Sequence, residues 1–321
     1  MESGIRSLPL RVFAPASIGN VAAGFDLLGA ALAPLDGTLL GDVVRVEPAT
    51  VDSFRVEGPF ASSLVPSERP NLVLRARDLF REAAGGGGPW AVTLEKRLPV
   101  ASGLGSSASS IAAALAAFQT ASGHPLDGPV LLALAGRAEG AYSGAAHLDN
   151  VAPSLLGGLR LVVPGREGRG AARELPWPDG MLFVVVHPDF ELPTARSRAV
   201  LPAEVPLAAA VDFAGNLAAL VHALHAGDPG LLARCLRDPL AEPFRAGRVP
   251  GFGEARRAAL EAGALGCSFS GSGPSVFAVA LEERAEAVAA GLRGAFRGAG
   301  LGSRSWICAL DTQGARILPG R

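Results

Sequence analysis

Cysteine is scarce in this chain of 321 residues, which contains only Cys235, Cys267 and Cys308. The three are far apart, odd in number and not arranged in the pairs that bind metals, so we infer no cysteine metal site. They fit a reducing cytosol, and we expect a cytoplasmic protein. Lysine is rarer still, with Lys96 alone among abundant Ala, Gly and Arg. Codon usage rich in G and C accounts for that bias as well as any function does.

An excess of either charge is also absent. The formal net charge is -1, from 29 basic and 30 acidic residues. No global field therefore favours nucleic acid, an anionic membrane or an acidic partner, and we expect neither nucleic acid nor membrane as a partner. An anionic ligand must be held by local groups.

Long uninterrupted apolar runs are missing as well. The opening segment MESGIRSLPLRVF has no apolar core of signal-peptide length, so we expect no targeting segment. The apolar stretch 207–226 is interrupted by Asp212, Asn216, His222 and His225, and we expect a soluble protein. Nearly half of the residues are apolar, enough to fill the core of one large domain or two lobes.

The pattern of apolar residues predicts a mixed α+β fold. Several strands precede the first long helix, and others follow in pairs, which favours two sheet-and-helix lobes over a doubly wound parallel sheet. The glycine run 85–88 is expected to end a helix, and the segment 164–180 to be a hairpin tip or an interlobe connection. We expect strands at 8–13, 42–46, 91–94, 158–163, 181–186, 275–279 and 306–310, and helices at 71–84, 106–120, 129–139, 207–226, 252–262 and 283–296.

The segment RLPVASGLGSSASSIAAALAAF predicts a glycine-rich turn that opens a helix. Gly103 and Gly105 allow main-chain N–H groups to approach a ligand closely, and the first turn of a helix binds phosphate oxygens. The Ser106 and Ser107 hydroxyls are short ligands for phosphate or Mg²⁺. The alternative is that one of these serines caps the helix. No lysine follows the second glycine, so the segment is not a Walker A loop.

Two further segments carry polar residues near strands. Asn20 and Asp26 follow a predicted strand. They could line a ligand pocket; the alternative is that Asn20 is a turn residue and Asp26 a helix N-cap. The run Gly271, Ser272 and Gly273 lies between two strand-like segments, where a plain hairpin turn is the alternative.

The three segments together resemble the motifs of the GHMP kinases, the family of galactokinase, homoserine kinase, mevalonate kinase and phosphomevalonate kinase. PVASGLGSSAS is similar to the phosphate-binding motif, with Ser109 where Ala is frequent, and CSFSGSGPSVFAV to the third motif. VFAPASIGNVAAGFDLLGAAL resembles the first motif in its homoserine kinase form. The resemblance implies a two-lobed fold, with an N-terminal lobe like ribosomal protein S5 domain 2 over residues 1–165 and a ferredoxin-like lobe over 166–321.

The same resemblance implies a site for ATP, Mg²⁺ and an amino-acid acceptor. Ser107 and Glu139 would hold Mg²⁺, and Asp26 or Asp149, placed in a polar turn after the Glu139 helix, could accept the hydroxyl proton if a base is used at all. For Asn71, a role as helix N-cap is almost as good an explanation as ATP binding. For Glu139, Asp149, Arg198 and Arg245, the alternative is an ordinary position on the surface. The implied ATP-binding residues are Asn71, Pro99, Gly103, Leu104, Gly105, Ser106, Ser107, Gly271, Ser272 and Gly273; the implied acceptor-binding residues are Asn20, Asp26, Asp149, Asn150, Thr194, Arg198 and Arg245, with Arg248 in reserve.

Residues 12–316 carry the resemblance, which is specific to the homoserine kinases. It implies phosphorylation of the L-homoserine hydroxyl, on the route to threonine, and a homodimer as a family-level expectation. Another GHMP kinase, acting on mevalonate or a sugar, is the first alternative, although no lysine lies near the first motif as mevalonate chemistry would favour. A non-catalytic binding protein is the second, and the intact Ser107 and Glu139 argue against it.

Overall fold

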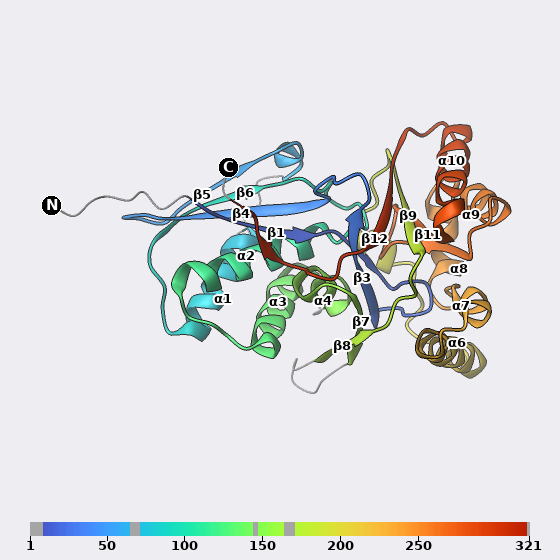
Figure 1. Cartoon of the computed structure of the whole chain (residues 1–321), viewed down its shortest axis with the longest axis horizontal. Helices are drawn as coiled ribbons and strands as arrows, with labels where there is room; N and C mark the ends of the chain where they lie inside the picture. The colour runs from blue at the N-terminus through green and yellow to red at the C-terminus, as the bar shows by residue number, and fades with distance from the viewer. Residues whose placement is uncertain (1–8, 65–70, 144–146, 164–170, 320–321) are drawn as a thin grey trace.

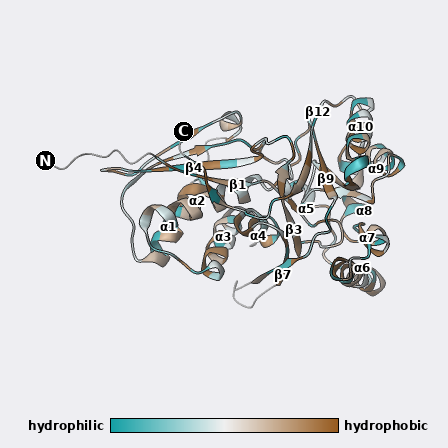
Figure 2. Cartoon of the chain, in the orientation of Figure 1, coloured by the Kyte–Doolittle hydropathy of each residue, from teal (hydrophilic) through white to brown (hydrophobic). Residues whose placement is uncertain are grey.

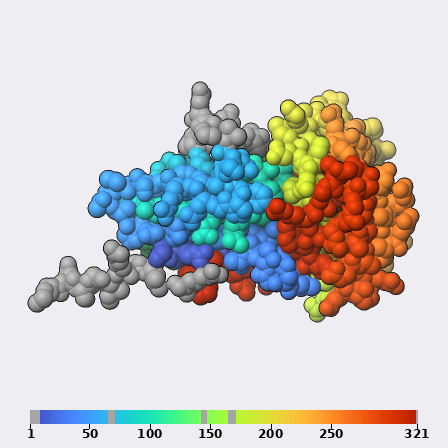
Figure 3. Space-filling model, turned by 90° about the horizontal axis from the view of Figure 1, so that it is seen from above, coloured from blue at the N-terminus to red at the C-terminus, as the bar shows by residue number. Residues whose placement is uncertain are grey.

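The computed structural model describes residues 9–64, 71–143, 147–163 and 171–319. The chain folds into two β-sheets that are covered by helices. Helices α1 to α4 lie against the first sheet, and α6 to α10 surround the far end of the second (Figure 1). From above, the N-terminal half and the C-terminal half form two lobes side by side (Figure 3). The expected α+β, two-lobed architecture is confirmed.

The first sheet has five strands in the order β13-β1-β4-β6-β5. All neighbours are antiparallel except β5 and β6. Val44, Val92 and Leu94 belong to a buried cluster with residues of α1 to α4, so one face of the sheet is covered by helices. The strands are β1 (Leu10–Pro15), β4 (Gly41–Pro48), β5 (Ser53–Glu57), β6 (Trp90–Glu95) and β13 (Arg316–Ile317).

Residues at its two ends explain where the first helix of this lobe begins and stops. The Asn71 side chain accepts a hydrogen bond from the Val73 N–H, 2.9 Å away, at the start of α1, and the left-handed Gly85 ends that helix as expected. Helix α2 is Ala-rich and buried along most of its length, which lets strands and helices approach it closely. The bounds are α1 (Leu72–Ala84), α2 (Ser106–Ser122), α3 (Gly128–Ser143) and α4 (Leu148–Leu156), with a short 3₁₀ turn η1 (Ala61–Ser63).

The second sheet runs in the order β10-β11-β9-β12-β3-β7-β8, with β2 beside β3. Its first four strands are antiparallel and, with α9 and α10, follow the chain order β-α-β-β-α-β of a ferredoxin-like lobe. The bounds are β2 (Ser17–Gly19), β3 (Leu28–Pro34), β7 (Leu159–Val163), β8 (Ala171–Leu175), β9 (Met181–Pro188), β10 (Gly266–Phe269), β11 (Val276–Leu281) and β12 (Ser303–Leu310).

Both faces of the ferredoxin-like sheet are buried. Alternate residues such as Val184 and Ala278 pack under α9 and α10, whereas Phe183 and Phe277 face a cluster that includes Leu220 of α6. Figure 2 shows the hydrophobic colour that runs through these strands. The helices are α5 (Thr194–Arg198), α6 (Leu207–Ala226), α7 (Pro229–Cys235), α8 (Glu242–Arg245), α9 (Phe252–Glu261) and α10 (Glu282–Gly298), and a 3₁₀ turn η3 (Ala246–Arg248) follows α8.

The C-terminal strands join the two lobes. Strand β12 pairs with β3, and β13 returns to the first sheet, where Ile317 lies opposite Val12. The expected lobe boundary near residue 165 falls in 164–170, outside the described residues, between the antiparallel strands β7 and β8. That boundary stays a prediction.

Among the described residues, α6 is the one helix that is long and apolar enough to cross a membrane, by length and composition only, and about a fifth (22%) of its most apolar window is buried. Its Asn216 amide donates to the carbonyl oxygens of Cys235 and Arg237, 3.0 and 3.1 Å away, which holds the helix against the segment after it. A single helix that passes this test is weak evidence for a membrane span, because core helices of soluble proteins pass it as well.

Candidate active site

The glycine turn ends in the first turn of α2. Gly103 and Gly105 both have left-handed backbones, with φ of 82° and 65°, and Gly105 is the N-cap without any side-chain cap. The alternative that a serine caps this helix is therefore wrong. Instead, the Ser107 hydroxyl donates a hydrogen bond of 2.9 Å to Glu139 Oε1 from α3. The two predicted metal ligands are in direct contact.

Both glycines are needed because neighbouring segments press against the turn. A Cβ atom on Gly103 would collide with the main-chain oxygen of Ser270, and one on Gly105 with the Ser17 hydroxyl. The turn thus lies between the first and third motif segments.

Hydrogen bonds join the three motif segments. The Ser270 hydroxyl donates to the Gly103 carbonyl oxygen at 2.6 Å, and the Asn20 amide donates to the Gly271 carbonyl oxygen at 2.8 Å. The Gly271 N–H donates to the Gly19 carbonyl oxygen at 3.0 Å. Segments more than 80 residues apart in the chain therefore form one site.

The first motif is a series of turns rather than a helix start. Asn20 and Asp26 have φ of 71° and 58°, and the Asn20 side-chain oxygen accepts a hydrogen bond of 2.9 Å from the Asp26 N–H. Residues 20–27 form no helix, so the alternative of Asp26 as a helix N-cap is wrong. The turns direct the Asp26 carboxylate towards Arg198 of α5.

Opposite charges meet beside the first motif. Arg198 donates from both terminal nitrogens to Asp26, at 3.1 Å to Oδ2 and through a shorter bond to Oδ1. The same guanidinium lies 3.2 Å from His147 Nδ1 and 5.6 Å from the Phe25 ring centre. Burial and the Arg198 charge lower the pKa of His147. This forked pair fixes the direction of both charges.

Arg245 approaches the same place from α8. It is buried, lies 5.3 Å from the Phe25 ring centre and donates to the carbonyl oxygens of Gly271 and Ser197, 3.1 and 3.4 Å away. Desolvation lowers its pKa. Arg248, the reserve candidate, is exposed in η3.

Asp149 does not lie in a polar turn, as the sequence suggested, but in the first turn of α4, where it is buried. The glycine-poor run 148–156 continues as a helix despite Pro153. Burial raises the pKa of Asp149 to about 7. Asp26 and Glu139 add to that rise, and Arg198 opposes it. Its Oδ1 atom accepts no hydrogen bond from the part of the chain that the structure describes.

Asn150 connects this acid to the glycine turn. Its amide lies 3.2 Å from Asp149 Oδ2, and its side-chain oxygen accepts a hydrogen bond of 3.0 Å from Ser17. A Cβ atom on Gly105 would lie 3.1 Å from the same oxygen. Asn150 therefore stands between the glycine turn and the charged cluster.

The comparisons with known proteins agree on one family. Sequence models of the GHMP kinases N terminal domain and of the GHMP kinases C terminal region match residues 71–158 and 220–298. The chain is 33% identical to a homoserine kinase from Cytophaga hutchinsonii, over 99% of both chains, with a TM-score of 0.90. It belongs to the GHMP kinase family.

More distant members share the fold. L. major mevalonate kinase, solved with R-mevalonate, is 17% identical over 94% of this chain and 95% of its own, with a TM-score of 0.68. Mevalonate diphosphate decarboxylase from Staphylococcus aureus is 16% identical over 97% and 98%, with a TM-score of 0.72. As a GHMP kinase, the chain is a phosphotransferase that uses ATP.

A metal ion in this GHMP kinase would depend on few protein groups. No set of three or more His, Cys, Asp or Glu side chains suited to a metal occurs within residues 9–64, 71–143, 147–163 and 171–319. Burial raises the pKa of Glu139, whereas the Ser107 hydrogen bond and the Lys96 charge lower it. Hard oxygen ligands from Ser107 and Glu139 fit Mg²⁺, which keeps waters and takes its remaining ligands from phosphates.

Three other predicted residues, Thr194, Pro99 and Asn71, have different surroundings. Thr194 Oγ1 lies 3.3 Å from Ser272 Oγ, so the third motif also meets α5. Pro99 lines a cavity of about 310 Å³ between η1 and the end of β9. Asn71 caps α1, and no hydrogen bond between described residues connects it to the glycine turn.

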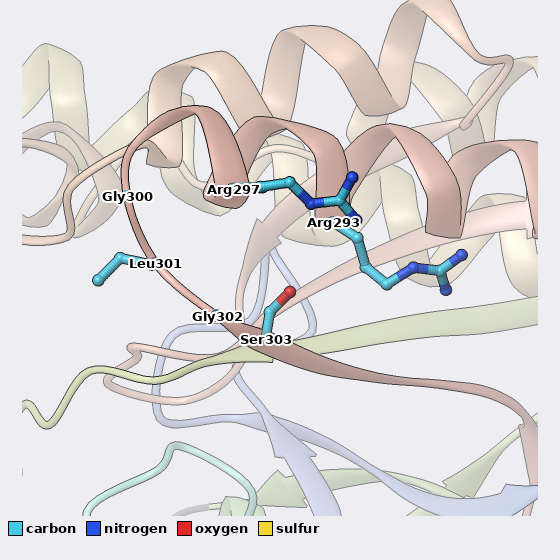
Figure 4. A pocket seen from close by; sticks show the side chains of 6 residues that line it. All are labelled: Arg293, Arg297, Gly300, Leu301, Gly302 and Ser303. Carbon is cyan, nitrogen blue, oxygen red and sulfur yellow. The ribbon is translucent and has the colours of Figure 1, made fainter.

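A larger cavity, of about 420 Å³, lies away from these motifs. Arg293, Arg297 and the loop Gly300–Ser303 line it, at the end of α10 and the start of β12 (Figure 4). None of its lining residues belongs to a motif segment.

Sequence reasoning missed several residues of the cluster. Phe25 stands inside the quoted first motif segment, and His147 lies two residues before Asp149, so their positions could have identified them. Lys96 and Asp42 lie under the glycine turn, and their only sequence signal is that Lys96 is the sole lysine.

Proposed function

We propose that this GHMP kinase is a homoserine kinase, which transfers the γ-phosphoryl group of ATP to the hydroxyl of L-homoserine and forms O-phospho-L-homoserine, an intermediate towards threonine. The supporting observation is the arrangement of opposite charges beside the phosphate turn: Arg198 and Asp26 are paired there, and the buried Asp149 lies close enough to be influenced by both. A zwitterionic amino acid needs that combination of cation and anion in a partly dry pocket. A cytoplasmic location fits the three free, buried cysteines.

In the proposed complex, the carboxylate of homoserine is held by Arg198 and Arg245. Guanidinium groups suit this role because they donate paired, charge-assisted hydrogen bonds. Arg198 is now engaged with Asp26, and Arg245 with two carbonyl oxygens. Homoserine would insert between Arg198 and Asp26. Its carboxylate would pair with Arg198, and its ammonium group would pair with Asp26.

The hydroxyl end of the acceptor would face Asn150 and Asp149, with Asn20 and Thr194 at the border of the pocket. Asn150 is placed to orient a hydroxyl group because it already lies against the glycine turn. Asp149 could accept the proton, since its pKa of about 7 leaves much of it ionised at neutral pH. Positioning alone is the alternative, because phosphoryl transfer asks mainly for alignment and charge neutralisation.

The nucleotide phosphates are assigned to the glycine turn. The N–H groups of Gly105, Ser106 and Ser107 are at the helix start, where no intrahelical partner is available, and the positive end of the α2 dipole favours anionic oxygens there. Ser107 and Glu139 would hold Mg²⁺, which when bound neutralises phosphate charge. The third loop, Gly271 to Gly273, closes the site from the C-terminal lobe through its hydrogen bonds to the first two motifs.

A coupled ADP-release assay with Mg-ATP tests the acceptor. Homoserine, mevalonate, galactose and shikimate are compared at equal concentration, and release is expected with homoserine alone. Release with another acceptor and none with homoserine would assign a different GHMP activity. No release with any acceptor would favour a non-catalytic binding protein.

A further inference from the structure

We propose that the buried ion pair of Lys96 and Asp42 positions the phosphate-binding turn, which makes Lys96 a positioning residue of the nucleotide site. The inference rests on the proposed function in assigning the nucleotide to the start of α2. Lys96 does not line the turn but lies beneath it, directly after β6.

All three N–H donors of the Lys96 ammonium group have hydrogen-bond partners. Its side chain is only 2% exposed, and that of Asp42 is 0% exposed. The Nζ atom donates to Asp42 Oδ2, to the Ser106 carbonyl oxygen at 2.9 Å and to the Ser110 hydroxyl at 3.1 Å. Lysine has three N–H donors, and each has a partner. Two of the partners belong to the first turns of α2.

Asp42 holds the other side of the turn. Its Oδ1 atom accepts hydrogen bonds from the N–H groups of Arg97 and Leu98, 2.8 and 3.0 Å away. Its Oδ2 atom accepts from Ser110 at 2.6 Å as well as from Lys96. One ion pair therefore fixes both the segment that enters the glycine turn and the helix that leaves it.

The neighbouring Ser109 hydroxyl extends this anchor to the sheet. It donates to the Ala14 carbonyl oxygen at 2.7 Å and accepts from the Asp42 N–H at 2.8 Å. Strands β1 and β4 are thereby linked to α2 at the level of the ion pair.

A contribution to folding stability does not by itself explain why Lys96 and Asp42 form a buried ion pair. Taking two charges out of water costs several kcal/mol for each ion, and an apolar pair of similar volume is often as stable or more stable. An apolar pair could not, however, donate to the Ser106 carbonyl oxygen while orienting the Arg97 and Leu98 N–H groups. Because Asp42 neutralises the Lys96 ammonium, the pair adds no net charge, and what it supplies to the turn is geometry.

A double variant separates positioning from stability. Asp42→Asn with Lys96→Met removes both charges together, so no unpaired charge is left buried. The matched control is Asp52→Asn with Arg81→Met, which removes a forked ion pair of the same lobe at the far end of α1. Binding of Mg-ADP by calorimetry needs no acceptor, and the melting temperature reports folding.

We expect the Asp42→Asn/Lys96→Met protein to fold, to bind Mg-ADP roughly tenfold more weakly and to lose about a hundredfold in kcat, as misplaced reacting groups do. The KM for homoserine should stay unchanged, and the control should keep wild-type affinity and kcat. Wild-type Mg-ADP affinity and kcat in the double variant would overturn the inference.

Three further outcomes are decisive. If the double variant does not fold, Lys96→Arg keeps the Asp42 charge paired but cannot reproduce three donors from one ammonium. Weaker Mg-ADP binding at an unchanged melting temperature then supports the inference, and wild-type binding contradicts it. If the wild-type chain binds no Mg-ADP, the proposed function fails and the inference with it. If it binds Mg-ADP but phosphorylates another acceptor, only the substrate assignment fails.

Discussion

The contact between Ser107 and Glu139 brings a hydroxyl from the phosphate turn to a buried acid of α3. Ser107→Ala and Glu139→Gln should each lower kcat by about a hundredfold or more, because each removes a group that would stabilise transition-state charge. Ser122→Ala, at the other end of α2, and Glu82→Gln, in an exposed pair with Arg137, are matched controls and should turn over normally.

Steady-state assays and circular dichroism check this prediction. Both site variants should keep the wild-type spectrum. Wild-type turnover in either one would remove that residue from the metal site.

Arg198 and Arg245 converge on Phe25 from different helices. Arg198→Leu and Arg245→Leu should raise the KM for homoserine far more than the KM for ATP. Losing one buried charged partner costs roughly 2 to 5 kcal/mol, much of it from the group left unpaired. Arg196→Leu, which changes an exposed arginine of the same α5, is the control. A defect confined to ATP affinity would place the arginine outside the acceptor pocket.

Asp149 should make acceptor use depend on pH. Its pKa is raised to about 7, so the carboxyl gains a proton as the pH falls through 7 and can no longer accept the hydroxyl proton of the acceptor. The kcat/KM for homoserine should fall as the pH is lowered from 8 to 6, because this ratio reports the free enzyme. Asp149→Asn should be weak at all pH values and show no such slope. An unchanged slope in that variant would assign the titration to another group.

At the scale of elements, the two ends of α2 offer a matched pair of glycines. Gly105 and Gly123 have φ of 65° and 67°, but an added Cβ meets Ser17 and Asn150 at the first and open space at the second. Gly123→Ala should cost about 1 to 2 kcal/mol of unfolding free energy, the price of a left-handed alanine, and leave kcat unchanged. Gly105→Ala should cost more and lower kcat. Urea unfolding and the ADP assay measure both, and equal effects on kcat would contradict the assigned role of the turn.

The sequence predicted the elements with strong patterns. Helices α2, α6, α9 and α10 were expected close to their observed bounds. In α10, Val288, Leu292 and Phe296 recur at one-turn spacing, and α2 is a run of strong helix formers. Strand β3, Leu28–Pro34, was missed because its Gly, Ala and Leu residues have no β-branched or alternating signal. Helix α4 was missed because the segment around Asp149 was interpreted as a polar turn.

Side-chain partners were harder to predict than elements. The motif segments indicated the glycine turn and the acids, whereas the pairing of Lys96 with Asp42 joins residues 54 positions apart and leaves no periodic trace. The Asp26–Arg198 pair joins residues 172 positions apart. Such contacts are set by how the sheets pack, which a single sequence does not display.

For the whole molecule, the pairings of β12 with β3 and β13 with β1 predict that the lobes unfold together. A Trp177→Phe/Trp306→Phe variant keeps Trp90, which is stacked on Phe118 in the first lobe, as its one tryptophan. Its fluorescence should change at the same urea concentration as the far-UV circular dichroism, which reports the helices of both lobes. Two separated midpoints would show that the lobes are independent.

The most direct test of the account is the chemical identity of the product. Phosphorus NMR and mass spectrometry of a reaction with Mg-ATP and L-homoserine should show ADP and one new phosphate monoester with the mass of homoserine plus a phosphoryl group. ADP with inorganic phosphate and no such ester, or an ester formed only when another alcohol is supplied, would contradict the proposed activity.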